Sequence, residues 1–245
     1  MRLFILFVLF TCLADRIALA QVQEPVPYLA EDVAYPNTAA PGVQLAGTLT
    51  KPPGQGPWPA ILLITGSGPQ NRDEEILGHR PFWVLADALT RLGFAVLRVD
   101  DRGTGQSTGS FRNATTLDFI TDGAASIRYL QARSDIDAGR IGLIGHSEGA
   151  VIAAVLAAQL PRISFVILLA GPGIPGDQLI EEQNYRIQIA AGIPPDRAAE
   201  ERKILHQILA IIMAVPYTPE AERQVILSVA RSGKSPQEVR AVQQD

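Results

Sequence analysis

One pentapeptide constrains the fold of this chain more than any other feature: Gly145–Gly149, with the sequence GHSEG. A G-x-S-x-G pattern alone is a weak signal, because small residues recur by chance. Here it lies between an apolar run over residues 141–144 and a second apolar run that begins at about residue 150. A serine on a tight turn between a buried strand and a buried helix is typical of a nucleophile elbow. The pattern therefore predicts Ser147 as a nucleophile; the alternative is an ordinary strand-to-helix turn that carries a serine.

Strand-like and helix-like patterns alternate from about residue 33 to residue 173. Continuous apolar runs indicate strands that are covered on both faces, and apolar residues at helical spacing indicate the helices that cover them. The predicted order is a strand at 43–49, a strand at 60–64, a helix at 82–92, a strand at 94–99, a helix at 117–130, the strand and helix around Ser147, and a strand at 165–169. This alternation indicates an α/β protein with a mainly parallel sheet.

Beyond Gly173 the pattern becomes helical throughout. Helical spacing, with proline at the first position of some segments, predicts helices over 177–191, 195–214, 219–232 and 236–245. No further strand is predicted there. The chain therefore divides into a region of alternating strands and helices and a region of helices alone.

The first 20 residues have the composition of an export signal. Arg2 precedes a nearly continuous apolar run over residues 3–13, and the sequence ALA at 18–20 resembles a cleavage site. The run is too short to span a bilayer. Cleavage after Ala20 would remove Cys12, the one cysteine, and with it any disulfide or thiolate ligand. We expect an exported protein, periplasmic or secreted and bacterial, with no integral membrane segment after cleavage.

Charge and composition argue against several classes of partner. The formal net charge is −4 and no basic run is present, which argues against nucleic acid as a partner. Apolar residues make up 47% of the chain, enough for a substantial core, so a chain disordered throughout is excluded. No histidine and carboxylate cluster has the spacing of metal ligands, so neither a metal nor another cofactor is expected.

Three further motifs accompany the elbow: TGSGP at 65–69, DRGTGQS at 101–107 and AGPG at 170–173. With them the chain resembles the α/β-hydrolases over roughly residues 33–180. More narrowly, it is similar to bacterial serine esterases and acylaminopeptidase-like hydrolases that carry a helical cap after the sixth strand. The resemblance implies an α/β-hydrolase fold with strands one to six of a mainly parallel sheet and a partial helical cap.

The same resemblance implies a reaction and its residues. Ser147 would attack a small carboxylic ester, with a thioester or a short peptide amide as alternative substrates. The backbone N–H groups of Ser67 and Glu148 would hold the oxyanion. The implied parts are a signal peptide at 1–20, the hydrolase core at 21–175 and an incomplete helical cap at 176–245.

The acid and the histidine of a catalytic triad have no clear candidates. In such hydrolases an acid and then a histidine follow the nucleophile along the chain. The one histidine after Ser147 is His206, whose neighbours follow helical spacing, whereas a triad histidine is expected on a loop. We therefore expect both triad partners to be missing from this chain, as in a fragment of a hydrolase. The alternatives are a non-catalytic binding protein of the same fold, and a hydrolase that uses His206 or His79 as its base.

Other polar residues near the motifs have structural interpretations. Residues 72–75, with the sequence RDEE, are expected to form a solvated, partly paired cluster. His146 is expected to pack beside the elbow without taking part in chemistry. The segment Asp101–Gly105 lacks the ending of a phosphate-binding loop and is expected to brace the floor of the site. The side chain of Glu148 is given no role.

Overall fold

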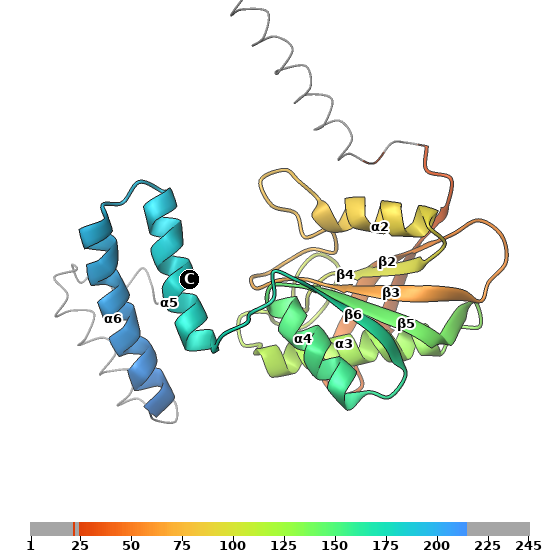
Figure 1. The fold of residues 1–245 in the computed structure, drawn as a ribbon. Helices are drawn as coiled ribbons and strands as arrows, with labels where there is room; N and C mark the ends of the chain where they lie inside the picture. The colour runs from red at the N-terminus through yellow and green to blue at the C-terminus, as the bar shows by residue number, and fades with distance from the viewer. Residues whose placement is uncertain (1–21, 23–24, 215–245) are drawn as a thin grey trace, which may run out of the picture. The chain divides into compact units, whose positions relative to one another are not determined.

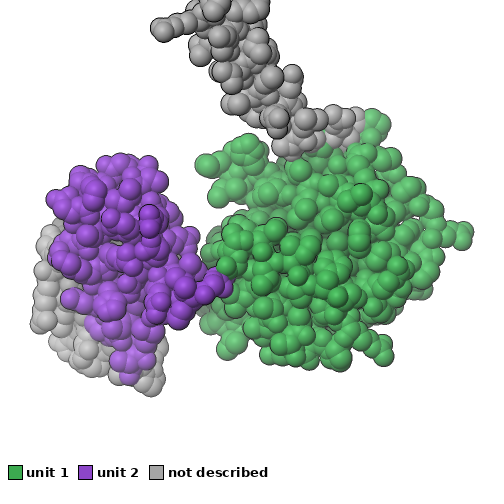
Figure 2. Space-filling view, viewed as in Figure 1, with its two compact units in different colours: residues 1–171 green, residues 172–245 purple. Residues whose placement is uncertain are grey.

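The computed structural model of the chain describes Val22 and residues 25–214. The chain forms two compact units, residues 1–171 and residues 172–245, which Figure 2 colours separately. Each unit is described by itself. The expected signal peptide at 1–20 and the expected helices at 219–232 and 236–245 lie outside the described residues.

The first unit is built on a six-stranded sheet with the order β1-β2-β4-β3-β5-β6 (Figure 1). Strands β4, β3, β5 and β6 pair in parallel, and β2 pairs antiparallel with both β1 and β4. The strands are β1 Leu29–Pro36, β2 Gln44–Lys51, β3 Trp58–Ile64, β4 Ala95–Val99, β5 Ile136–His146 and β6 Ile163–Leu169. The predicted α/β class with a mainly parallel sheet is confirmed.

Helices cover both faces of this sheet, which explains the continuous apolar runs in its strands (Figure 1). Helix α2, Pro81–Arg91, lies on one face, and α3, Thr116–Gln131, and α4, Glu148–Gln159, lie on the other. Successive side chains of a strand point to opposite faces. In β3, Leu62 accordingly packs with the α3 and α4 side chains, whereas Ile61 and Leu63 pack with those of α2.

Helix α2 shows how local signals set the ends of a helix. Pro81 occupies its first turn, where the missing N–H of proline leaves no intrahelical hydrogen bond unmade. Gly93 follows the helix with a φ of 100°, a conformation that glycine adopts without steric cost. The chain then enters β4. Both ends agree with the predicted helix at 82–92.

Strand β1 is not among the strands predicted from the sequence. Its sequence, LAEDVAYP, mixes charged and small residues and ends in proline. Ion pairs hold the strand in place: Glu31 binds Lys51 of β2 at 2.8 Å and Arg133 at 3.0 Å. Asp135 binds the same two cations. An ion-pair cluster therefore joins this outer strand to its neighbour and to the turn before β5.

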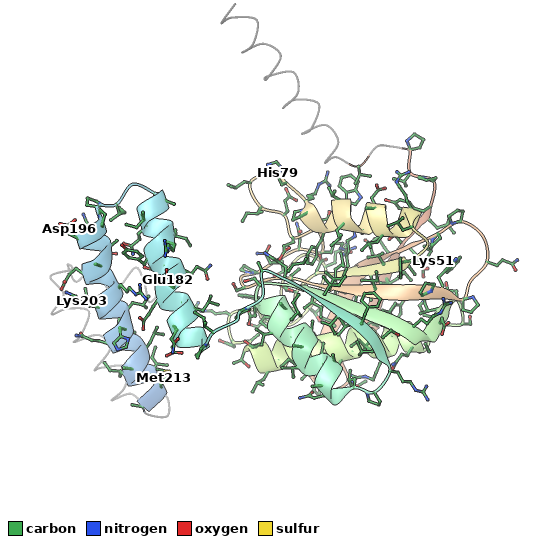
Figure 3. All side chains as sticks on the ribbon, viewed as in Figure 1. Lys51, His79, Glu182, Asp196, Lys203 and Met213 are labelled. Carbon is green, nitrogen blue, oxygen red and sulfur yellow. The ribbon has the colours of Figure 1, made fainter. Side chains whose placement is uncertain are left out.

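The second unit, as far as the structure describes it, is a pair of helices joined by a short turn. Helix α5, Gly176–Ala190, and helix α6, Pro195–Ala214, agree with the predictions at 177–191 and 195–214. Among their described residues only Ala198 is buried. Glu182 of α5 binds Arg186 at 2.7 Å and Arg202 of α6 at 2.9 Å. Figure 3 labels Glu182 together with exposed positions of α6.

Candidate active site

The turn at Ser147 has the geometry of a nucleophile elbow. Ser147 adopts φ 52° and ψ −115°, a region that residues with a side chain rarely occupy. The glycines on either side permit this turn. A side chain at Gly145 would overlap the backbone of Gly149, and a side chain at Gly149 would overlap the carbonyl oxygens of Ile64 and Thr65. The turn therefore requires glycine on both sides of the serine.

The end of strand β6 and the start of helix α4 hold Ser147 at the carboxyl edge of the sheet. Its own N–H donates to the carbonyl oxygen of Leu169, the last residue of β6, at 2.9 Å. Helix α4 begins at the next residue, Glu148. The first N–H groups of a helix have no intrahelical acceptor and carry the positive end of the helix dipole. The Glu148 N–H is therefore suited to bind a negatively charged oxygen.

The loop after β3 lies against the elbow. A Cβ built on Gly66 would be 3.3 Å from the Cβ of Ser147, so the chain passes the serine at van der Waals distance. The Gly66 N–H donates to the Oε1 of Glu74 at 2.7 Å and is occupied. The N–H of the exposed Ser67 donates to no acceptor among the described residues. The fold thus brings the segment of Ser67 together with Ser147 and Glu148.

The expectation that residues 72–75 form a solvated cluster is wrong for Glu74. Its side chain is buried, with 6% of the residue exposed, and its Oε1 also binds the Nδ1 of His146 at 2.8 Å. His146 is therefore held by a carboxylate rather than by packing alone. Only contacts between segments far apart in the chain give Glu74 this role, and its position in an acidic run carries no signal of it.

Two ion pairs fix the chain immediately before Glu74. Arg72 donates to Asp100 from its Nη2 at 2.7 Å and from its Nε at 3.1 Å, and Asp73 pairs with the buried Arg98. Burial alone would raise the pKa of Asp100, but hydrogen bonds from Arg72 and from the Gln106 N–H hold that pKa below its usual value. The loop that carries Glu74 is thus anchored to the end of β4.

Asp101 holds the other side of the same loop. It accepts hydrogen bonds from the Thr65 hydroxyl at 2.7 Å and from the Gln70 N–H at 2.9 Å. Burial raises the pKa of Asp101 to about 7, although both hydrogen bonds favour the carboxylate form. The expected bracing role of this segment agrees with these contacts.

A cavity of about 50 Å³ lies beside this loop. That volume is large enough for ordered water. Its polar lining includes Thr65, Asp101, Asp122 and Glu148. The Glu148 carboxylate, for which no role was expected, accepts a hydrogen bond at Oε1 from the Thr116 hydroxyl of α3 at 2.6 Å. The start of α4 is therefore tied to the start of α3.

The remaining histidines lie in different surroundings. His79 is exposed in the loop before α2 (Figure 3). His206 lies within α6, as predicted, and binds the Oε1 of Glu181 at 2.7 Å in the second unit. The described part of the chain contains no group of three or more potential metal ligands. None of its helices is both long and apolar enough to cross a membrane.

Part of this sequence is similar to a known protein family and to several named proteins. Residues 41–183 match the family described as X-Pro dipeptidyl-peptidase (S15 family). Esterase EstD of Thermotoga maritima is 31% identical over 144 residues, which cover 59% of this chain and 34% of EstD. The putative hydrolase YtaP of Bacillus subtilis is 31% identical over 146 residues, which cover 53% of this chain and 48% of YtaP. The chain thus spans between about a third and a half of the length of these relatives.

A solved structure agrees with the fold. The Pyrococcus furiosus esterase Pf2001 aligns with a TM-score of 0.55 at 20% identity, over 73% of this chain and 65% of its own. At this identity the likeness shows the fold alone. Because the family match covers more than half of the 245 residues, the chain belongs to the S15 family of X-Pro dipeptidyl-peptidases, and its fold is that of the α/β-hydrolases.

Proposed function

We propose that the protein hydrolyses small carboxylic esters by acyl transfer to Ser147. The observation that carries the proposal is the elbow itself, with the loop of Gly66 at van der Waals distance from Ser147. A serine at this position attacks the ester carbonyl and displaces the alcohol. The resulting acyl-enzyme is then hydrolysed by water.

The proposed oxyanion donors are the N–H groups of Ser67 and Glu148. The Glu148 N–H opens a helix, where the dipole favours negative charge. The Ser67 N–H has no acceptor among the described residues, so it is available to a substrate oxygen. Donors of this kind act on the charge that develops in the transition state.

We assign none of the three histidines of the chain as the general base. His206 lies within helix α6 and binds Glu181, and His79 is exposed in the loop before α2. His146 adjoins Ser147 in the chain, but among the described residues its ring hydrogen-bonds to Glu74 and not to the Ser147 hydroxyl. Without a base, substrate binding and the oxyanion hole still accelerate hydrolysis by about 10³–10⁴-fold over the uncatalysed reaction in water. The 245-residue chain should therefore hydrolyse p-nitrophenyl acetate only slightly above background.

An ester is the preferred substrate class because the related EstD is named an esterase and YtaP a hydrolase. The family name points instead to peptides with proline as the second residue. Ala-Pro p-nitroanilide therefore forms the amide arm of the assay. Faster turnover of the anilide than of p-nitrophenyl acetate would reverse the assignment.

The nucleophile is tested by covalent labelling, which needs a single reaction event. A fluorophosphonate ester should phosphonylate Ser147, and added imidazole should accelerate labelling because it supplies the absent base. Peptide mass mapping locates the adduct. Ser147→Ala should abolish it, whereas Ser67→Ala should retain it, since the side chain of Ser67 is exposed and only its N–H is proposed to act.

Absence of an adduct on Ser147 in the presence of imidazole contradicts the proposed nucleophile. Efficient turnover of p-nitrophenyl acetate without imidazole would mean that one of the histidines is the general base. In that case His206→Ala and His79→Ala identify which histidine serves as the base.

We also propose that the protein is exported, on the pattern of residues 1–20 alone. Mass spectrometry of the mature protein should find a terminus at Gln21. An intact Met1 on cytoplasmic protein would refute this.

A further inference from the structure

Glu74 occupies a fixed and unusual position between β3 and α2. Its backbone adopts φ 51°, in the left-handed region that a residue with a side chain seldom occupies. Its N–H donates to the carbonyl oxygen of Asn71 at 2.9 Å, and the ion pairs of Arg72 and Asp73 precede it. Backbone strain of this kind persists only where the surroundings enforce it. The direction of the Glu74 side chain is therefore set by the fold.

One oxygen atom of Glu74 joins two segments that are 80 residues apart in the chain. Oε1 accepts the Gly66 N–H at 2.7 Å and contacts the Nδ1 of His146 at 2.8 Å. When the carboxylate is the acceptor, Nδ1 carries a proton, and in the neutral ring Nε2 is then the bare nitrogen. The contact therefore fixes both the rotation and the tautomer of the His146 ring.

The three partners meet around a single point. A Cβ on Gly66 would lie 3.2 Å from the His146 Nδ1, 3.3 Å from the Glu74 Oε1 and 3.3 Å from the Ser147 Cβ. Because Gly66 has no side chain, the carboxylate reaches the backbone beside the nucleophile. The bond to Glu74 also orients the peptide between Thr65 and Gly66, one peptide unit before the Ser67 N–H.

We propose that Glu74 is a positioning residue that sets the distance between the oxyanion loop at Gly66–Ser67 and the elbow at His146–Ser147. This inference rests on the proposed function of Ser147. Glu74 touches neither the substrate nor the reacting atoms, and acts through the Gly66 N–H and the His146 ring. A displacement of about 1 Å at an active site costs on the order of 100-fold in rate. Release of this bridge should have an effect of that size.

Two conservative variants distinguish the effect of the length of the Glu74 side chain from the effect of its charge. Glu74→Gln keeps the length of the side chain and an oxygen that can accept both hydrogen bonds, but loses the charge. Glu74→Asp keeps the charge but is one methylene shorter. If the bridge acts by position, Glu74→Gln should label Ser147 within about threefold of the wild-type rate, and Glu74→Asp should be slower by about 100-fold. A purely electrostatic role predicts the opposite order.

The measurement is the imidazole-assisted phosphonylation rate of Ser147 in the full 245-residue chain, with folding verified by circular dichroism. The Gly66 amide proton in the NMR spectrum provides a second readout, since loss of a carboxylate acceptor moves it upfield. That shift should occur in Glu74→Asp and be smaller in Glu74→Gln. Glu75→Ala is the matched control, because Glu75 is exposed and contacts neither Gly66 nor His146.

His146→Ala should slow labelling less than Glu74→Asp does, because the Gly66 N–H keeps its acceptor. Wild-type rates in Glu74→Asp, or a rate in Glu74→Gln as low as in Glu74→Asp, would overturn the inference while the nucleophile assignment stands. A wild-type protein that is not labelled at Ser147 instead removes the proposed function, and the positioning role falls with it.

Discussion

The two compact units differ in how fully their helices and strands bury apolar residues. In the α/β unit, Leu143 of β5 is 0% exposed and lies between the sheet and its helices. In the helical unit, Ile187 of α5 is 59% exposed, and Ala198 alone is buried among the described residues of α5 and α6. Both units are rich in aliphatic side chains. Apolar content therefore fixes a structure only where a second surface is present to cover it.

The largest expected effect tests this contrast directly. Leu143→Ala removes fully buried methyl groups and leaves a cavity, which should lower the free energy of unfolding by about 2–5 kcal/mol. Ile187→Ala is the matched change on α5 and should cost less than about 0.5 kcal/mol, because the side chain is already exposed. Urea titration followed by circular dichroism measures both. Equal losses would mean that Ile187 is covered in solution.

A buried charge distinguishes the α/β unit further. The pKa of Asp101 is about 7 in the folded protein and close to 3.8 when unfolded, so the folded state binds more protons between these values. Stability should therefore fall as pH rises from about 4 to 7 and stay low above. Asp101→Asn mimics the protonated form, since its amide can hydrogen-bond to Thr65 and its oxygen can accept the Gln70 N–H.

Asp101→Asn should accordingly gain on the order of 1–3 kcal/mol over the wild type at pH 8 and little at pH 4. Urea titrations at the two pH values provide the measurement. A gain of the same size at both pH values would show that the titration of Asp101 does not cause the difference.

The smallest effect is expected from an exposed charge in the helical unit, and it has the opposite sign. A hydrogen bond from Arg186 holds the pKa of Glu182 below its usual value, so this pair contributes stability above the unfolded pKa and loses it as pH falls. Glu182→Gln should slightly accelerate hydrogen exchange in α5 at pH 7. The difference between the variant and the wild type should vanish in 1 M salt, because the Debye length there is only about 3 Å and the ion pair is screened. A persistent difference at high salt would point to packing instead.

The sequence predicts those strands that the fold buries on both faces. Residues 60–64 are uniformly apolar because Ile61 and Leu62 face different helices, and this leaves a pattern that needs no knowledge of the partners. Strand β1 leaves no such pattern. Glu31 is held there by Lys51 and Arg133, and a pairing of charges across 20 and 102 residues is not visible along the chain.

The same division applies to the site. Ser147 is predictable because its glycines are a local requirement of the turn. Glu74 is not, because its role depends on the approach of Gly66 and His146, which only the folded chain brings together. A constraint within one turn leaves a recognisable sequence motif, whereas a contact between distant segments leaves none at any of the residues that form it.

The hydrogen bond from Ser147 to Leu169 makes the end of β6 part of the elbow. In the described part of the chain β6 is an outer strand, with Ile167 and Leu168 exposed, and its pairing aligns Leu169 with His146. A shift of β6 by one residue would replace the carbonyl that holds the serine. The backbone position of Ser147 therefore depends on the register of an outer strand of the sheet.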